Sequence, residues 1–566
     1  MITMSFRIDG GDFDSAGLAT SRLKEHLARA GVGAPAMRRA MIAAYEAEMN
    51  VVIHARTGTL WARLDRGRLD LEIADEGPGI PDVGSALREG WSTASERARQ
   101  MGFGAGMGLP NIRRNSDLFE IETRVGRGTR IRSTILLDGP GSEVRAGDVP
   151  AAGDVLAGGD VPAAAPVPLA VDRARCRRCM RCIEACPAAA LRVRRGGPEL
   201  VDELCIGCAV CAAECGSGVY GIAEKIAGDN DALARVPADA VLVLPRGFLS
   251  GFPIENAPPR VLAAMRALGF RDVRLLEEWA GALRAAAGES AHAGGAGRAV
   301  LPRIPPLCPA AVALVESRFP SLIPQLGAWL SPAEAAGEEF PLRPVVLVAA
   351  CPGQYAAACR GSLTGRLTVL SPARLADAVR PLLAAGGDEP PAPEVIAHAD
   401  PALMAGELAV HGPRHVLRAL SAAEAGRLPG VSLLNLFLCE GGCSGSPLLT
   451  TDSCLSEQRW RDFEAGRLGG DRRTDDRRSG DRQSDDRQSQ AAAVARSRPW
   501  SQRLGVRLDP DMGKAIETLG RIDALARSLP GRDCGACGSP TCAAFAEDVI
   551  LERARGATCP HAEERE

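Results

Sequence analysis

The sequence has few aromatic residues and almost no net charge. Phe, Trp and Tyr make up 4% of its 566 residues, and the formal net charge is −3. Such a chain produces no general positive field, so binding to nucleic acid or to an anionic membrane surface is not predicted. It contains no uninterrupted apolar run long enough to span a bilayer. Its first residues, MITMSFRIDGGDFDSAG, lack the charged-then-apolar pattern of a secretion signal. We therefore expect a cytoplasmic protein.

Cysteine is missing from the first part of the chain and abundant afterwards. No cysteine precedes Cys176, yet the whole sequence contains 18. A disulfide framework is typical of small secreted domains, whereas this chain is long and has no evident secretion signal. Clustered cysteines in such a chain indicate metal binding.

The chain is too long for one compact core, and composition divides it into several segments. Residues 1–137 are predicted to form one α/β unit, because residues 69–74 and 129–135 alternate apolar and polar side chains as strands do, and residues 34–55 have a helical pattern. Residues 138–168 repeat Gly, Asp, Pro and Ala without periodicity, which indicates a flexible linker.

The remaining segments follow the same logic. A cysteine-rich module covers residues 169–225. Residues 238–460 alternate apolar runs such as AVLVLP with helical stretches, the pattern of a second α/β domain. Residues 465–497 form a charged low-complexity linker that includes a pentapeptide repeat, and residues 500–566 form a small helical domain. The overall prediction is a multidomain protein of mixed α/β and α+β class.

Eight cysteines between 176 and 215 have the spacing of a two-cluster iron–sulfur module. Each run has two-residue gaps that let a tight loop present three thiolates to one 4Fe–4S cluster, and the fourth cysteine serves the other cluster. The first cluster would take Cys176, Cys179, Cys182 and Cys215, and the second Cys205, Cys208, Cys211 and Cys186. Paired zinc sites are the alternative. The module resembles bacterial two-cluster ferredoxins, with Gly216 in place of the usual second proline.

The N-terminal unit carries an ordered series of polar and glycine motifs. Glu46, Asn50 and His54 recur every four residues and so share one helix face. They are followed by an acidic glycine box, a glycine-rich loop and a Gly-Thr pair, namely Asp75, Gly77, Gly79, Gly102, Gly104, Gly106, Gly108, Gly128 and Thr129. This order resembles the GHKL (Bergerat) ATP-binding fold, an α/β sandwich, and most closely its anti-sigma-factor and switch-kinase branch.

The resemblance implies a role for each motif. Glu46 would act as general base or position a water molecule, Asn50 would hold Mg²⁺, and Asp75 would accept a hydrogen bond from the adenine amino group. The glycines from Gly102 to Gly108 would close over the phosphates. The resemblance suggests serine/threonine kinase or ATPase activity, and a degenerate domain that binds no nucleotide is the alternative.

Four further cysteines lie in the second α/β domain, at Cys308, Cys351, Cys439 and Cys443. The segments around them, PPLCPAAVALVESRFP, VVLVAACPGQ and LFLCEGGCSGSP, resemble the signature loops of iron-only hydrogenase large subunits, in which the matching cysteines hold a cubane cluster. Active enzymes carry a cysteine and a lysine where this chain has Leu307 and Gln354, so a di-iron centre and hydrogenase activity are not expected. Four buried structural cysteines are the alternative.

The last cysteines, Cys534, Cys537, Cys542 and Cys559, stand in a glycine-rich segment followed by a predicted helix from Cys542. They resemble the small 4Fe–4S domain of electron-transfer and corrinoid iron–sulfur proteins, and zinc is the alternative metal. Cys359 and Cys454 fit no motif and are expected to be ordinary buried thiols.

Together these features predict a regulatory protein related to iron-only hydrogenases. The leading hypothesis is a redox or hydrogen sensor that couples the state of two to four 4Fe–4S clusters to a domain that binds ATP with Mg²⁺ and acts on a partner protein. One alternative is a hydrogenase-type oxidoreductase or electron-transfer subunit. The other is an electron carrier or scaffold whose ATP domain only docks a partner.

Overall fold

The structure is a computed structural model. It describes residues 1–13, 15–93, 106–137, 169–222, 239–253, 257–293, 301–340, 342–360, 367–384, 405–449, 452–465, 495–496, 499–501, 503 and 506–562. The predicted linker 138–168, the pentapeptide repeat at 471–490, and Gly102 and Gly104 lie outside these residues. No helix within the described ranges is long and apolar enough to cross a membrane.

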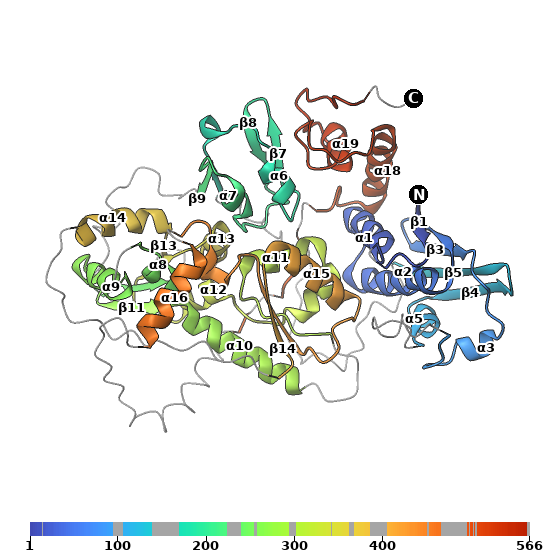
Figure 1. The fold of residues 1–566 in the computed structure, drawn as a ribbon, viewed down its shortest axis with the longest axis horizontal. Helices are drawn as coiled ribbons and strands as arrows, with labels where there is room; N and C mark the ends of the chain where they lie inside the picture. The colour runs from blue at the N-terminus through green and yellow to red at the C-terminus, as the bar shows by residue number, and fades with distance from the viewer. Residues whose placement is uncertain are drawn as a thin grey trace.

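The N-terminal domain is an antiparallel sheet covered on one face by helices (Figure 1). The sheet has the order β1-β2-β3-β5-β4. Its strands are β1 (Ile2–Asp9), β2 (Thr57–Leu64), β3 (Arg68–Asp75), β4 (Leu118–Arg124) and β5 (Gly128–Leu136). Its helices are α1 (Leu18–Ala30), α2 (Ala34–His54), α3 (Val83–Ala86) and α5 (Gly108–Arg114). The predicted helix and both predicted strands are present within one or two residues of the expected positions.

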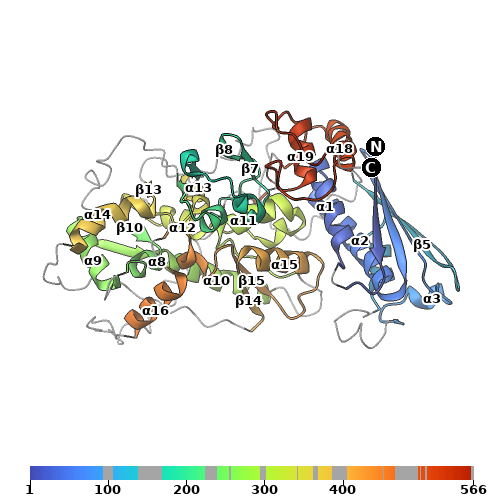
Figure 2. The same cartoon turned by 45° about the horizontal axis from the view of Figure 1, so that its top comes forward.

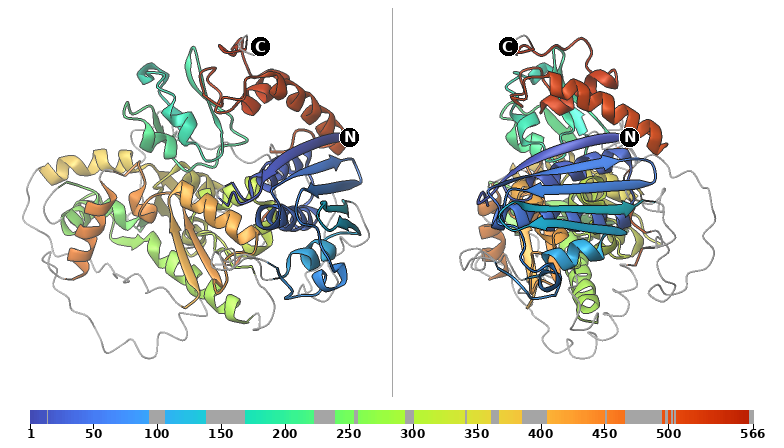
Figure 3. Two further views of the ribbon diagram at one scale, coloured as in Figure 1. Left: turned by 45° about the vertical axis from the view of Figure 1, so that its right-hand side comes forward. Right: turned by 90° about the vertical axis from the view of Figure 1, so that its right-hand side faces the viewer.

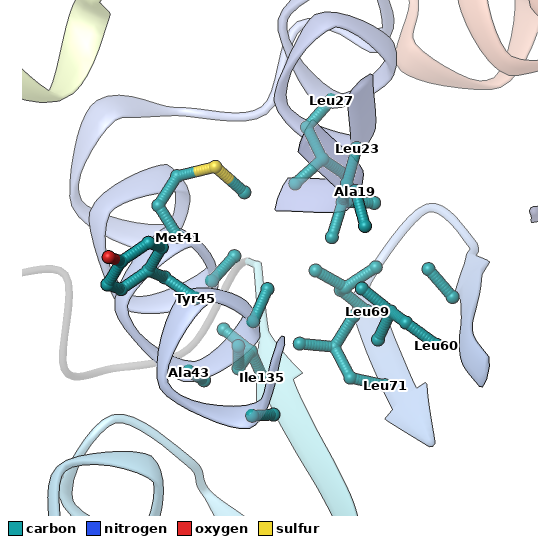
Figure 4. Close-up of a cluster of buried hydrophobic side chains, with 14 of the residues drawn as sticks. Ala19, Leu23, Leu27, Met41, Ala43, Tyr45, Leu60, Leu69, Leu71 and Ile135 are labelled. Carbon is teal, nitrogen blue, oxygen red and sulfur yellow. The ribbon is translucent and has the colours of Figure 1, made fainter. Parts of the chain in front are cut away.

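The core of this domain lies between the sheet and the two long helices. Alternate residues of β2 and β3 point into it, as do Leu23 and Leu27 of α1; Figure 4 shows these side chains meeting Leu60, Leu69 and Leu71. Helix α1 begins after Gly17, which offers no capping side chain. The buried carboxylate of Glu48 on α2 replaces that cap, because it accepts hydrogen bonds from the backbone N–H groups of Gly17, Ala19 and Thr20 at 2.9, 3.1 and 2.9 Å.

The cysteine-rich module is small and built from two similar halves. Its elements are β6 (Leu169–Val171), the 3₁₀ turn η1 (Arg173–Arg175), α6 (Arg181–Ala185), β7 (Leu191–Arg194), β8 (Gly197–Leu200), α7 (Val210–Glu214) and β9 (Tyr220–Ile222). Strand β6 pairs with β9, and β7 pairs with β8, both antiparallel. Each cysteine loop enters its short helix through a non-glycine residue with positive φ, Met180 at 66° and Ala209 at 61°.

The central domain contains two parallel sheets. The larger has the order β11-β10-β12-β13, from β10 (Val241–Leu244), β11 (Asp272–Leu275), β12 (Val345–Val348) and β13 (Leu367–Leu370). The smaller pairs β14 (Glu407–His411) with β15 (Leu433–Phe437). Strands β10 and β12 are buried throughout, as expected for parallel strands covered on both faces.

Helices surround these two sheets. They are α8 (Arg246–Ser250), α9 (Ala257–Ala267), α10 (Leu276–Ala293), α11 (Pro309–Arg318), α12 (Pro332–Glu338), α13 (Pro352–Arg360), α14 (Pro372–Ala384), α15 (Pro413–Glu424) and α16 (Ser453–Glu464). The 3₁₀ turns η2 (Pro320–Gln325) and η3 (Gly442–Gly445) complete the domain.

The C-terminal domain consists of α18 (Met512–Ser528) and α19 (Cys542–Ile550), joined by the cysteine loop. The helix predicted to start at Cys542 is therefore confirmed. These helices lie beside both the N-terminal domain and the cysteine-rich module (Figures 1, 2 and 3). The mixed α/β and α+β fold class predicted from the sequence is confirmed.

The N-terminal domain also contacts the central domain. Lys24 of α1 pairs with Glu424 of α15 at 2.5 Å, and its ammonium lies 3.5 Å from the centre of the Phe319 ring. Burial lowers the pKa of Lys24 to about 8, although Glu424 acts in the opposite direction. Arg318 bonds to both Glu25 of α1 and the Pro187 carbonyl of the cysteine-rich module, at 2.7 and 2.8 Å. One arginine thus joins three domains.

Candidate nucleotide and iron–sulfur sites

The face of α2 that is predicted to bind nucleotide packs against the start of α5. The Nδ2 group of Asn111 donates to Glu46 Oε1 at 2.7 Å. A β-carbon added to Gly108 would lie 3.1 Å from Asn50 Oδ1 and 3.5 Å from Glu46 Oε2, so the backbone of α5 comes directly against both side chains. Burial raises the pKa of Glu46, and the hydrogen bond from Asn111 opposes this effect. A carboxyl with a raised pKa is suited to proton transfer near neutral pH.

Asp75 stands at the end of β3 and is held by two backbone groups. Its Oδ1 atom accepts from Gly77 N at 2.8 Å and from Thr129 N at 3.2 Å. Burial raises the pKa of Asp75, while these two bonds lower it. Gly128 has φ +89°, and a β-carbon there would lie 1.9 Å from the Asp75 carbonyl oxygen, so this position requires glycine. The structure thus brings Asp75, Gly77 and Thr129 together.

The other predicted glycines border the same region. Gly79 has φ +72° and packs against the backbone of Arg124, and Gly106 has φ +73° and packs against that of Gly90. His54 lies near Asp75, whose charge raises the pKa of His54, although burial lowers it by more.

The first four cysteines predicted as one ligand set line one cavity. Cys176, Cys179, Cys182 and Cys215 surround a space of about 260 Å³ together with Val193 and Tyr220. The backbone N–H of Arg178 donates to Cys176 Sγ at 3.3 Å. A sulfur-lined cavity with such a donor fits a 4Fe–4S cluster, whose potential depends on hydrogen bonds to its sulfurs.

The second predicted ligand set lines a tighter cavity. Cys186, Cys205, Cys208 and Cys211 surround about 20 Å³, so the loop would have to open slightly to admit a cluster. Ala190 N donates to Cys186 Sγ at 3.3 Å. Burial raises the pKa of Cys205 to about 11, which means that these thiols must lose protons when they bind metal. Both cavities therefore combine three cysteines of one run with the distal cysteine of the other, as the spacing predicts.

The four cysteines of the central domain also converge. Burial raises the pKa of Cys443 well above its ordinary value, and the nearby Cys308, Cys351 and Cys439 raise it further. Gln354 takes part in this group, because its Nε2 donates to Cys443 Sγ at 3.2 Å and its backbone N–H donates to Cys351 Sγ at 3.4 Å. Leu307 is buried, with 3% of its surface exposed.

The second ferredoxin-type loop lies directly on this group. Gly353 N donates to the Gly207 carbonyl at 3.0 Å, and Gly207 has φ +70°. Gly207 stands between two predicted ligands of the second cavity, and Gly353 follows Cys351 by two residues. The loops that carry the two predicted cluster sites are thus in direct backbone contact.

In the C-terminal domain, Cys537, Cys542 and Cys559 pack on a small core around Phe545, while Cys534 is exposed at the start of the loop. Gly535 and Gly538 have φ +70° and +83° and let the chain turn tightly between the cysteines. Within the described ranges, no group of three or more His, Cys, Asp or Glu side chains converges closely enough to hold a single metal ion.

One prediction about individual cysteines is wrong. Cys359 and Cys454 are exposed rather than buried, because they lie on the solvent-facing sides of α13 and α16.

Comparison with known families assigns four regions of the chain. Residues 12–135 match the histidine kinase-like ATPase domain. The serine/threonine-protein kinase RsbT of Bacillus subtilis is 33% identical over 107 residues, which cover 18% of this chain and 74% of RsbT. The chain belongs, through its N-terminal domain, to the histidine kinase-like ATPase family. The anti-sigma F factor of Caldanaerobacter subterraneus subsp. tengcongensis is 34% identical over 94 residues, which cover 16% of this chain and 62% of that protein.

The other three regions are iron–sulfur and hydrogenase-related domains. Residues 169–216 match the 4Fe–4S dicluster domain, residues 244–340 the C-terminal domain of the iron-only hydrogenase large subunit, and residues 529–561 a putative Fe–S cluster domain. The hydrogenase match includes Cys308 but ends before Cys351. The predicted composite of an ATPase-like domain with iron–sulfur and hydrogenase-like domains is therefore confirmed.

Among solved structures, the FeFe-hydrogenase HydA1 of Chlamydomonas reinhardtii is 15% identical, and the alignment covers 41% of this chain and 86% of HydA1. At a TM-score of 0.31, this likeness supports no conclusion by itself.

Proposed function

We propose that this protein is an iron–sulfur sensor that regulates a partner protein through its histidine kinase-like ATPase domain. The observation that carries the proposal is that the ATPase domain directly contacts the central and C-terminal domains, and is linked through them to the ferredoxin-type module. Arg318 alone bonds to α1 of the ATPase domain and to the carbonyl of Pro187, next to Cys186. A change at the cysteine sites thus has a short physical route to the nucleotide domain.

The nucleotide would be held by residues at the ends of α2 and β3. Asn50 would bind Mg²⁺, Asp75 would accept from the adenine amino group through its second oxygen, and the glycines from Gly106 to Gly108 would face the phosphates. Glu46, held by Asn111, would orient the attacking hydroxyl or water and receive its proton. Bound ATP supplies the phosphoryl group, and the partner's serine or threonine would be its acceptor.

The cysteines would hold 4Fe–4S clusters in the two ferredoxin-type cavities, in the central domain and in the C-terminal domain. Such clusters supply one-electron exchange. Hydrogen production is not part of this proposal, since Leu307 and Gln354 occupy the positions of the relay cysteine and of the lysine. The hydrophobic Leu307 cannot carry a proton.

The deciding experiment is a measurement of ATP affinity on full-length protein purified without oxygen. We expect the affinity of the dithionite-reduced form to differ from that of the oxidised form by about fivefold or more. Equal affinities, together with equal phosphotransfer to candidate partners, would contradict the sensor function. Failure to bind ATP in either state would favour a scaffold or electron carrier.

A further inference from the structure

Two adjacent carboxylates on α19 bind two different domains. Asp548 is fully buried, and its Oδ2 accepts from Arg192 Nε at 2.6 Å, Arg194 Nη2 at 2.7 Å and Ser539 Oγ at 2.7 Å. Both arginines belong to β7 of the ferredoxin-type module. Neighbouring residues of a helix do not share a face. The preceding Glu547 accordingly points elsewhere and pairs with Arg29 of α1 in the ATPase domain.

The contact with the ferredoxin-type module is reinforced by the backbone. Val193 N donates to the Gly538 carbonyl at 2.8 Å, and Arg194 Nη1 donates to the Cys537 carbonyl at 2.9 Å. Gly538 cannot carry a side chain there, since its β-carbon would lie 1.8 Å from the Val193 carbonyl oxygen. The segment next to a predicted ligand, Cys537, is therefore fixed to a strand whose Val193 lines the first cysteine cavity.

The contact with α1 is also more than one ion pair. Arg29 donates to the Val506 carbonyl at 2.8 Å, and its own carbonyl accepts from Leu508 N at 3.0 Å. His26 lies 3.0 Å from Asp523 of α18. Ile516 and Leu519 of α18 belong to the same hydrophobic core as α1 and the sheet. The C-terminal domain is thus bound along the outer side of α1.

Helix α1 in turn is bound to the helix of the nucleotide site. Glu48, which is 2% exposed, holds the first turn of α1 and stands between Glu46 and Asn50 on α2. A shift of α1 would pull on this carboxylate, and so on the turn of α2 that carries the predicted catalytic and Mg²⁺-binding side chains. A cavity of about 1210 Å³ lies beside these contacts, lined by residues of α1 and α19 and by Ala188, Ala189 and Arg192. The three domains are therefore joined at discrete contacts with open space between them.

From these contacts we propose that α19 is the element that couples the cysteine sites to the nucleotide site. It begins at the predicted ligand Cys542, Asp548 anchors it to the ferredoxin-type module, and Glu547 transmits its position to α1. The proposal rests on the sensor function proposed above and identifies its route.

The test uses the full-length protein with its iron, and three variants. Glu547→Gln removes the ion pair between the two helices (the tie) from the side of α19, and Arg29→Gln removes it from the side of α1 together with the hydrogen bond to the Val506 carbonyl. Glu517→Gln is the matched control, because Glu517 is an exposed acid on α18. Iron content is measured for each variant, so that loss of a cluster is distinguished from loss of the tie.

The first readout is hydrogen exchange across residues 18–30. We expect about tenfold faster exchange in Glu547→Gln and Arg29→Gln and no change in the control. The second readout is the ratio of ATP affinities in the oxidised and reduced states, which we expect to approach one in both tie variants and to keep the wild-type value in the control.

The outcomes separate the two proposals. Equal ATP affinities of the oxidised and reduced wild-type protein overturn the sensor function, and the coupling role with it. If the two ATP affinities differ in the wild type and differ equally in both tie variants, the coupling role alone is overturned. The contact between Lys24 and Glu424 would then be the route. Unchanged exchange in α1 overturns the coupling role whatever the ratio.

Discussion

At the scale of single residues, Gln354 is held by two hydrogen bonds beside the cysteine group of the central domain. Its Nε2 atom donates to the sulfur of Cys443, a predicted ligand, and its Oε1 atom accepts from Ala350 N at 2.8 Å. The side chain is therefore committed to the cysteine group and to the backbone beside it.

Replacing this donor should change the potential of the cluster held by Cys443. A hydrogen bond to a ligand sulfur stabilises the reduced cluster, which carries one more negative charge than the oxidised cluster. Gln354→Leu removes this bond and should therefore shift the midpoint potential to a more negative value. A redox titration followed by electron paramagnetic resonance measures the shift. Gln458→Leu, at an exposed glutamine on α16, is the control and should leave the potential unchanged. An unaltered potential in Gln354→Leu would show that the bond to Cys443 does not form in the loaded protein.

His26 makes the contact between α1 and α18 sensitive to pH. Burial lowers the pKa of His26, but the hydrogen bond and charge of Asp523 outweigh it, with smaller contributions from the Arg22 carbonyl and Glu25, so the pKa lies above its ordinary value of 6.5. A group whose pKa is higher in the folded than in the unfolded state stabilises the folded protein. This contribution is complete at pH values below the unfolded-state pKa, and it is lost as the pH rises through the folded-state pKa.

We therefore expect the unfolding temperature of the wild type to fall as pH rises above 6.5, and the fall to be smaller in His26→Gln. Scanning calorimetry between pH 6 and 8 measures both slopes. His415→Gln, at an exposed histidine on α15, should behave as the wild type does. Identical slopes in wild type and His26→Gln would contradict the charged contact.

How far the site could be predicted depends on the sequence distance between partners. Glu46, Asn50 and Asp75 were identified because each stands in a local motif with a fixed spacing. Asn111, which holds Glu46, and Glu48, which caps α1, were missed. Their bonds span 65 and 28 to 31 residues, and nothing in the sequence around them indicates their partners. Glu48 lies two residues after Glu46 and so on a different side of α2, which separates it from the predicted polar face.

At the scale of secondary structure elements, local periodicity predicted strands and helices correctly, whereas the burial of individual cysteines was predicted wrongly. The strands β3 and β5 and the helices α2 and α19 were predicted from alternation, helical spacing and the residues at their ends. The exposure of Cys359 and Cys454 depends on which side of α13 and α16 faces a neighbouring element, and that is decided by packing between distant segments.

The contact between β7 and α19 contains one buried acid, Asp548, between two arginines. Removing one partner of a buried ion pair leaves charge without compensation, which costs about 3–5 kcal/mol. Asp548→Asn should therefore release the C-terminal domain from the ferredoxin-type module. Urea unfolding, monitored by the hydrogen exchange of β7 and α19, measures the loss of stability. Glu552→Gln, at an exposed acid just after α19, is the control, and equal protection of α19 in both variants would contradict the prediction.

At the scale of the whole molecule, the kinds of domain could be predicted but their arrangement could not. Cysteine spacing and glycine motifs identify domains because metal and phosphate require those residues near one another in sequence. Several contacts between domains are made by Arg29, Arg192, Arg194 and Arg318, which resemble any other arginines in a chain with 67 Lys and Arg residues. Only the folded structure distinguishes them from solvated surface charges.

The arrangement makes the ATPase domain depend on the far end of the chain. A protein that ends at residue 505 should have an ATPase domain with a lower unfolding temperature, since Ile516 and Leu519 each contribute about 1.5–3 kcal/mol when buried. Hydrogen exchange of β1 and α1 measures the effect. Leu519→Ala in the full chain should reproduce part of it, whereas Glu517→Ala should not. A truncated protein as protected as the full chain would show that the domain completes its own core.

The shared core of α1, β1 and α18 has a consequence for how the protein is made. The ribosome synthesises the ATPase domain before α18, the helix that completes its core, and the ferredoxin-type module and the central domain lie between them in the sequence. A chain in which α18 is missing or unfolded keeps an apolar stripe exposed on its ATPase domain. Chaperones and proteases act on such surfaces. Copies in which α18 has not packed on the ATPase domain are therefore expected to be degraded faster than fully folded copies.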